Sequence, residues 1–193
     1  MARLDLATRP SVAPPRGLRV RAHPVLSVLL VVTALGLFAS PVFAAAKTKT
    51  VSFSGHYSGT ASLLIENGSV TISSVKGSGT GTPSVIGASK ISGHGSGAAS
   101  ALCDPFGGTG AMTGAKAKMT FTVTRSSAKG CSSGQSGPVT VTFNGTGKVT
   151  GGTGTAAGAS GTLHFSGSMT LGGTSGSQSG SFRATVSGKL TIK

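Results

Sequence analysis

Apolar and polar residues alternate one by one in several stretches after residue 46. Residues 139–143 alternate valine and phenylalanine with threonine, and residues 182–186 repeat the pattern with phenylalanine, alanine and valine. A period of two predicts β-strands with one buried face. No stretch shows the spacing of an amphipathic helix of useful length. The predicted strands cover residues 47–54, 61–66, 69–72, 85–91, 118–124, 138–150, 161–171 and 181–192.

These short, closely spaced strands predict an all-β fold. We expect a single antiparallel β-barrel of about 7–9 strands, or a barrel-like sandwich. Asn67-Gly68 lies between two apolar runs and predicts a tight hairpin, because a type I′ turn favours that pair. Residues 93–114 lose the alternation and are interpreted as a long loop. Further breaks are expected at residues 125–137 and 172–180.

A different pattern occupies the N-terminal part of the chain. An apolar run at residues 25–39 follows an arginine-rich lead and ends on small residues, with possible cleavage after Ala44 or Ala46. This is the pattern of a secretory signal peptide, and the run is shorter than the roughly 20 residues of a membrane-spanning helix. An uncleaved anchor is the alternative. We therefore expect a helical signal peptide at residues 1–46 and a secreted barrel domain at residues 47–193, located outside the cell, either free or associated with the cell envelope.

Composition leaves two interpretations of residues 47–193 open. The chain contains 32 glycines, most of them after residue 46 and interspersed with serine and threonine. Such a composition is also typical of disordered linkers. The regular alternation of β-branched and aromatic residues favours a folded domain, since a linker does not need that order.

The charge balance points to anionic partners. Lysine and arginine outnumber aspartate and glutamate 17 to 3, and after residue 46 the only carboxylate side chains are Glu66 and Asp104. A basic surface favours an anionic cell-wall polymer. Specific recognition of nucleic acid is not expected, because the cations are dispersed along the sequence and the chain has one tyrosine and no tryptophan to stack on bases.

Cys103 and Cys131 are the only cysteines. In an exported chain an even pair predicts a disulfide, here expected to hold the glycine-rich segment between two blocks of strands. A metal or redox pair is the alternative, which the absence of CxxC spacing and of a neighbouring histidine disfavours.

One glycine-rich motif carries a resemblance. Residues 148–167 read KVTGGTGTAAGASGTLHFSG, and the glycines lead into a strand rather than a helix, which excludes a nucleotide-binding loop. The motif resembles the glycine-rich element of small antiparallel barrels in the allene oxide cyclase and dirigent group, where a strand, a tight turn with a bulge and a return strand lie near the end of the barrel. Ala156 replaces the usual large apolar residue. The matching positions are Gly151, Gly152, Gly154, Gly158, Ala159 and Gly161.

The sequence contains no recognisable catalytic constellation. The polar and acidic residues that line the barrels of that group have no match here, and His56, His94 and His164 lack zinc-binding spacing. We predict no catalytic residues, no metal and no cofactor, and a non-catalytic structural or binding module. The alternative is a barrel that carries or isomerises a small apolar ligand. Its pocket would be lined by Phe53, Ile65, Phe121, Phe143, Phe165 and Phe182.

Overall fold

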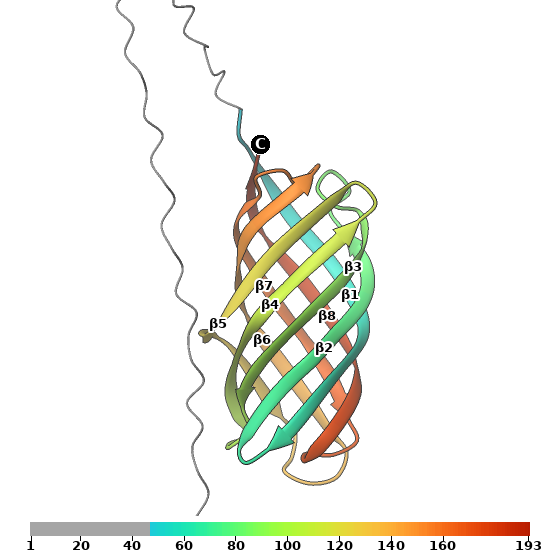
Figure 1. The fold of residues 1–193 in the computed structure, drawn as a ribbon, viewed down its shortest axis with the longest axis vertical. Coiled ribbons are helices and arrows are strands. Elements are labelled where there is room, and N and C mark those ends of the chain that lie inside the picture. Colours follow the sequence, from blue (N-terminus) through green and yellow to red (C-terminus); the bar gives the residue numbers. More distant parts are fainter. Residues whose placement is uncertain (1–46) are drawn as a thin grey trace, which may run out of the picture. The chain divides into compact units, whose positions relative to one another are not determined.

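The computed structural model describes residues 47–193, which form a closed barrel of eight antiparallel strands in sequence order (Figure 1). The prediction of an antiparallel barrel is confirmed. The signal peptide predicted at residues 1–46 lies outside the described residues. The strands are β1 (Lys49–Glu66), β2 (Ser69–Gly81), β3 (Ala88–Ala98), β4 (Cys103–Gly114), β5 (Ala117–Ser132), β6 (Val139–Gly154), β7 (Ser160–Leu171) and β8 (Gly176–Ile192).

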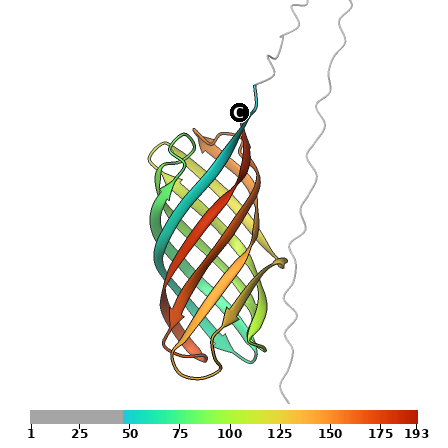
Figure 2. The same ribbon diagram turned by 180° about the vertical axis from the view of Figure 1, so that it is seen from behind.

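Each strand pairs with its neighbours in the sequence, and β1 pairs with β8 to close the barrel (Figure 2). Side chains alternate between the two faces of the strands, except at β-bulges such as the one between Ile72 and Val75 of β2. In β1, for example, Phe53, Tyr57 and Ala61 are buried, whereas Ser54 and Ser58 are exposed. The outer face is therefore dominated by hydroxyl groups and the inner face by apolar groups. Within residues 47–193, no helix is long and apolar enough to span a membrane.

The Asn67-Gly68 hairpin is confirmed. The two residues join β1 to β2, and both have positive φ, 50° at Asn67 and 70° at Gly68. A type I′ turn requires positive φ at both central positions. In the pairing of β1 with β2, Glu66 and Ser69 on either side of this turn lie directly opposite each other.

The expected loops and breaks at glycine-rich segments are wrong. The two strands expected at residues 47–54 and 61–66 are one continuous strand, β1, which begins at Lys49. Residues 93–114, expected to be a loop, belong mostly to β3 and β4. β5 continues to Ser132 and β8 begins at Gly176, so both expected interruptions are much shorter. In the region of residues 85–91, only the part from Ala88 is strand, and Val85 is buried in the preceding loop.

Pairing between phenylalanine and glycine explains why these segments are strands. Every phenylalanine in residues 47–193 lies directly opposite a glycine of a neighbouring strand. The pairs are Phe53–Gly188, Phe106–Gly97, Phe121–Gly110, Phe143–Gly167, Phe165–Gly145 and Phe182–Gly59. A large ring on the inner face of a narrow barrel covers the backbone of a neighbour without a side chain. A Cβ on Gly110, for example, would overlap the ring of Phe121. The glycines that are paired with phenylalanines therefore occupy inner-face positions of strands and do not indicate loops.

One end of the barrel is closed by two loops, residues 82–87 and 155–159. Val85 and Ala156 are each completely buried there, and Thr155 Oγ1 donates a hydrogen bond of 2.7 Å to the carbonyl oxygen of Val85. Val85 and Ile86 donate their backbone N–H groups to the carbonyl oxygen of Thr82, which folds the first loop inward. We call this the closed end. Both the start of β1 and the end of β8 lie at it (Figure 1).

The glycine motif forms the second of these loops. Gly151, Gly152 and Gly154 end β6, Gly158 lies in the turn and Gly161 lies in β7. Gly154, Gly158 and Gly161 have positive φ. A Cβ on Gly152 would overlap the carbonyl oxygen of Ala156, and a Cβ on Gly154 would overlap that of Lys116, whereas a Cβ on Gly151 would meet only Thr120 Oγ1, at 3.9 Å.

These differences predict graded effects on stability. Gly137 and Gly154 have nearly the same φ, 69° and 64°, but a Cβ on Gly137 would meet nothing within 4 Å. We expect Gly137→Ala to lower the free energy of unfolding by about 1 kcal/mol through backbone strain alone. Gly154→Ala should cost about 2–3 kcal/mol because it adds a steric clash, and Gly151→Ala should change stability by less than about 0.5 kcal/mol. Equilibrium unfolding in urea measures all three, and equal losses at Gly137 and Gly154 would contradict the steric account.

Candidate functional site: an apolar cavity with one mouth

The interior of the barrel holds a cavity of about 470 Å³. Its wall is formed by the inner faces of all eight strands, and it extends from the middle of the barrel to the end opposite the closed end. Apolar side chains dominate the wall. They include Leu63, Ile65, Val70, Phe106, Phe121, Phe143, Leu163, Phe165, Met169, Phe182 and Val186.

Glycines leave part of this wall without side chains. Gly93 and Gly95 of β3 and Gly108 and Gly110 of β4 line the cavity on adjacent strands. Larger residues would not fit at these positions, because a Cβ on Gly95 would overlap the carbonyl oxygen of Gly107 and one on Gly108 that of His94. Eight strands enclose a space that side chains can fill completely. Here the glycine wall keeps part of that space open.

Aromatic rings cross the cavity from opposite sides. Phe106 projects from β4 and Phe165 from β7, and their ring centroids are 6.1 Å apart with the planes tilted by 54°. Tilted contacts at this distance are the favoured geometry of aromatic pairs. The two rings therefore form an apolar contact across the interior of the barrel.

The mouth of the cavity lies at the end that carries the β1–β2, β3–β4, β5–β6 and β7–β8 connections. Residues 99–102, Gly134, Gln135, Gly173 and Thr174 line it. Leu102 is 48% exposed, the only large hydrophobic residue in the described part of the chain to be exposed. An exposed leucine at the rim extends the apolar wall to the surface.

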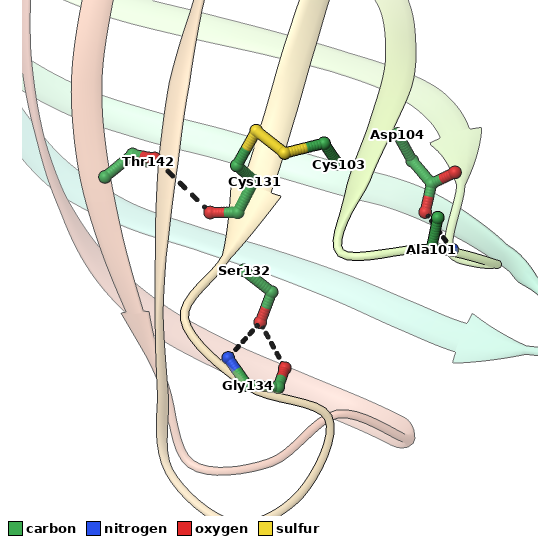
Figure 3. The surroundings of a disulfide bond; sticks show 7 residues. All are labelled: Ala101, Cys103, Asp104, Cys131, Ser132, Gly134 and Thr142. Carbon is green, nitrogen blue, oxygen red and sulfur yellow. Dashed lines mark hydrogen bonds between the residues drawn. A yellow bond between two sulfur atoms is a disulfide. The ribbon is translucent and has the colours of Figure 1, made fainter.

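A disulfide fixes the rim of the mouth (Figure 3). Cys103 and Cys131 are bonded, and they are directly opposed residues of the paired strands β4 and β5. The expected bond is therefore present, but it joins two paired strands and does not hold a loop. Next to it, Ser132 donates its backbone N–H to the carbonyl oxygen of Leu102 at 2.7 Å.

Asp104 orders the loop that carries Leu102. Its carboxylate accepts a hydrogen bond of 2.8 Å from the backbone N–H of Ala101, drawn in Figure 3, and one of 3.2 Å from the hydroxyl of Ser100. Asp104 also lines the cavity, whose lining includes no lysine or arginine. The mouth therefore presents a carboxylate without a compensating cation among the lining residues.

Tyr57 is the one buried titratable side chain in residues 47–193. It lies between the cavity and the closed end, where its hydroxyl is 2.9 Å from Ser89 Oγ and donates to Met112 Sδ at 3.4 Å. Burial raises the pKa of the Tyr57 hydroxyl, and the hydrogen bond with Ser89 partly offsets this. Tyr57 is thus a neutral, hydrogen-bonded residue of the core.

The residues proposed from sequence as a pocket separate into two groups. Ile65, Phe121, Phe143, Phe165 and Phe182 line the cavity. Phe53 does not, because it is packed in the core near the closed end, 2% exposed. Sequence reasoning missed the glycine wall, Leu102 and Asp104. The alternation of serine or histidine with glycine in residues 92–97 is the sequence signal that could have identified β3.

Metal-binding and histidine chemistry find little support in this geometry. Nowhere in residues 47–193 do three or more His, Cys, Asp or Glu side chains gather as a possible metal site. His94 and His56 are exposed and lie on the outer face, within 3.2 Å of Thr109 Oγ1 and Thr185 Oγ1 respectively.

No known protein family, curated protein or solved structure matches this chain.

Proposed function

We propose that this chain is a non-catalytic binding protein that holds a small apolar molecule inside its barrel. The observation that carries the proposal is the apolar cavity of about 470 Å³ with a single mouth. This volume falls within the roughly 300–1,000 Å³ of small-molecule sites. Unfilled apolar volume costs stability, roughly 24 cal/mol per Å³, so a barrel whose role was only structural would gain by filling it.

The proposed site of action is outside the cytoplasm. The signal pattern of residues 1–46 and the disulfide between Cys103 and Cys131 support export, since disulfides persist in oxidising compartments. The hydroxyl-rich outer face and the apolar inner face support a role in carrying an apolar molecule through an aqueous space.

The lining favours an uncharged ligand. A buried carboxylate or phosphate needs a cation or several hydrogen-bond donors, and no lysine or arginine lines the cavity. Asp104 at the mouth would repel an anionic head group. Suitable ligands are therefore hydrocarbons, alcohols, ketones or isoprenoids of moderate size.

Binding is favoured over isomerisation because few titratable side chains line the cavity, and one of them, His94, is exposed and its ring lies beside the hydroxyl of Thr109. General acid–base catalysis needs a titratable side chain within hydrogen-bond reach of the ligand. Asp104 lies only at the mouth, already holding Ala101 and Ser100, and Tyr57 is hydrogen-bonded below the cavity.

A fluorescence titration tests this function. We expect the uncharged dye Nile red to bind the oxidised protein saturably, and dodecanol to displace it. Dodecanoate, which has the same chain length but a charged head, should displace the dye at least about tenfold less well, because its carboxylate finds no partner cation. Absence of saturable dye binding would refute the binding function. Equal displacement by dodecanoate would refute only the preference for uncharged ligands.

A further inference from the structure

The lysines that are dispersed in the sequence gather at one end of the folded barrel. Seven of the twelve cationic residues after residue 46 lie within three positions of the closed-end terminus of a strand, or in the loops there. All seven are exposed. They are Lys47, Lys49, Lys90, Lys116, Lys118, Lys189 and Lys193, which we call the lysine ring.

Topology explains why sequence inspection does not find this ring. In an up-and-down barrel, alternate strand ends return to the same rim. The lysines stand at the starts of β1, β3 and β5, at the end of β8 and in the connecting turn at Lys116. The only two side-chain carboxylates of residues 47–193, Glu66 and Asp104, lie at the opposite rim, beside the mouth.

This separation creates a strongly asymmetric electrostatic surface. Strands of 12–18 residues flank the cavity, such as β1 and β7. At about 3.3 Å per residue and a tilt near 40°, they place the two rims roughly 30–45 Å apart. The Debye length is about 8 Å at physiological ionic strength, so the acids at the mouth do not neutralise the ring.

The chemistry of the ring narrows the class of partner. Binding to nucleic-acid bases needs aromatic side chains for stacking, and insertion into a membrane needs exposed large apolar groups. The one tyrosine is buried, and Leu102, the exposed large hydrophobic residue of the described chain, lies at the other end. The ring offers flexible ammonium groups on a surface of serine and threonine, which suits recognition of charge alone.

We propose that the lysine ring is a docking surface for a polyanionic polymer with phosphate groups along a hydroxylated, base-free backbone, as in polyol phosphates of a cell wall. Docking through the closed end leaves the mouth, at the far rim, facing away from the polymer. Ligand exchange then continues while the protein is held in place. This inference is independent of the proposed apolar ligand, because it uses none of the residues that line the cavity.

Two matched triple variants test the location of the site. Lys116→Gln, Lys118→Gln and Lys193→Gln together remove three charges from the ring. Arg125→Gln, Lys129→Gln and Arg183→Gln remove three charges from strand positions that are not neighbours of a ring lysine, and all six side chains are exposed. Both variants have the same net charge, so any difference between them reports position.

The measurement is binding of the intact protein to inorganic polyphosphate at several NaCl concentrations. We expect the ring variant to lose affinity roughly tenfold or more and its salt dependence to fall by about two in log–log slope, since each lost contact contributes roughly 0.7 on a single-stranded polyanion. The control variant should change by less than about threefold. Nile red binding should be unchanged in both, which separates this test from that of the cavity.

Two outcomes would overturn the proposal. Equal losses in the two triple variants would show that polyphosphate responds to net charge without a docking surface. Tighter binding to phosphatidylglycerol vesicles than to polyphosphate, at equal phosphate concentration and with loss in the ring variant, would identify a membrane surface as the partner instead.

Discussion

Replacing Gly147 by leucine should abolish Nile red binding while leaving the barrel folded. Gly147 is on the inner face of β6 and lines the cavity. A Cβ there would make ordinary contacts, 3.4 Å from Val123 and 3.5 Å from Phe121, so the side chain can enter without moving the backbone. Its apolar atoms then occupy the space of the ligand. We expect a loss of affinity of at least about tenfold, with stability unchanged or slightly raised because apolar volume is filled.

Gly151→Leu is the matched control for this experiment. Gly151 is on the same strand and has room for a side chain, but it does not line the cavity. Its dye affinity should remain close to that of the unmodified protein. Thermal unfolding of both variants verifies that the barrel is intact. If Gly147→Leu binds the dye as well as Gly151→Leu does, the dye binds outside the cavity and the proposed site is wrong.

Removal of the disulfide should have the largest effect on stability. The bond between Cys103 and Cys131 spans 28 positions of the sequence. Closing a loop of that length in the unfolded chain contributes roughly 3–4 kcal/mol. The double variant Cys103→Ser, Cys131→Ser should therefore unfold at a much lower urea concentration, with the difference in free energy in that range.

The disulfide variant should also bind dye less tightly than the unmodified protein under conditions in which both are fully folded. Cys131 is next to Ser132, whose N–H holds the carbonyl of Leu102 at the rim, and Cys103 is next to Asp104. Without the disulfide the rim of the mouth is more mobile, and ordering it around the ligand makes the free energy of binding less favourable. Dye titration well below the unfolding midpoint measures this. Unchanged affinity there would show that the rim is held by hydrogen bonds alone.

The fold class could be predicted from the sequence because the first half of β5 and most of β6, β7 and β8 contain regular alternation of threonine or serine with large apolar residues. Most of β3 and much of β4 could not be predicted. Their inner positions are glycines that face rings on neighbouring strands, such as Gly97 opposite Phe106 and Gly110 opposite Phe121. A pattern of glycine and serine contains no hydrophobic period, because the apolar group belongs to the partner strand. Only the pairing register of the strands shows which glycine lies opposite which aromatic ring.

The site was partly predictable for a related reason. Alternation shows that Phe53 and Phe165 point inward, but not how far each lies along the barrel. That depth depends on the pairing register and on which loops fold over an end. Because Val85 and Ala156 pack into the closed end, Phe53 becomes core and the cavity begins nearer the other rim, from about Ala61 onward.

The pairing between β1 and β8 has a consequence for biogenesis. Seventeen residue pairs, from Lys49 opposite Ile192 to Ile65 opposite Gly176, join the first strand to the last. Until β8 has been synthesised, β1 and β7 are long unpaired edges, which are templates for aggregation. The chain therefore cannot complete its sheet gradually during translation. A pathway that keeps it unfolded until the last residue has emerged, as secretion in an extended state does, would protect those edges at the stage when they are most exposed.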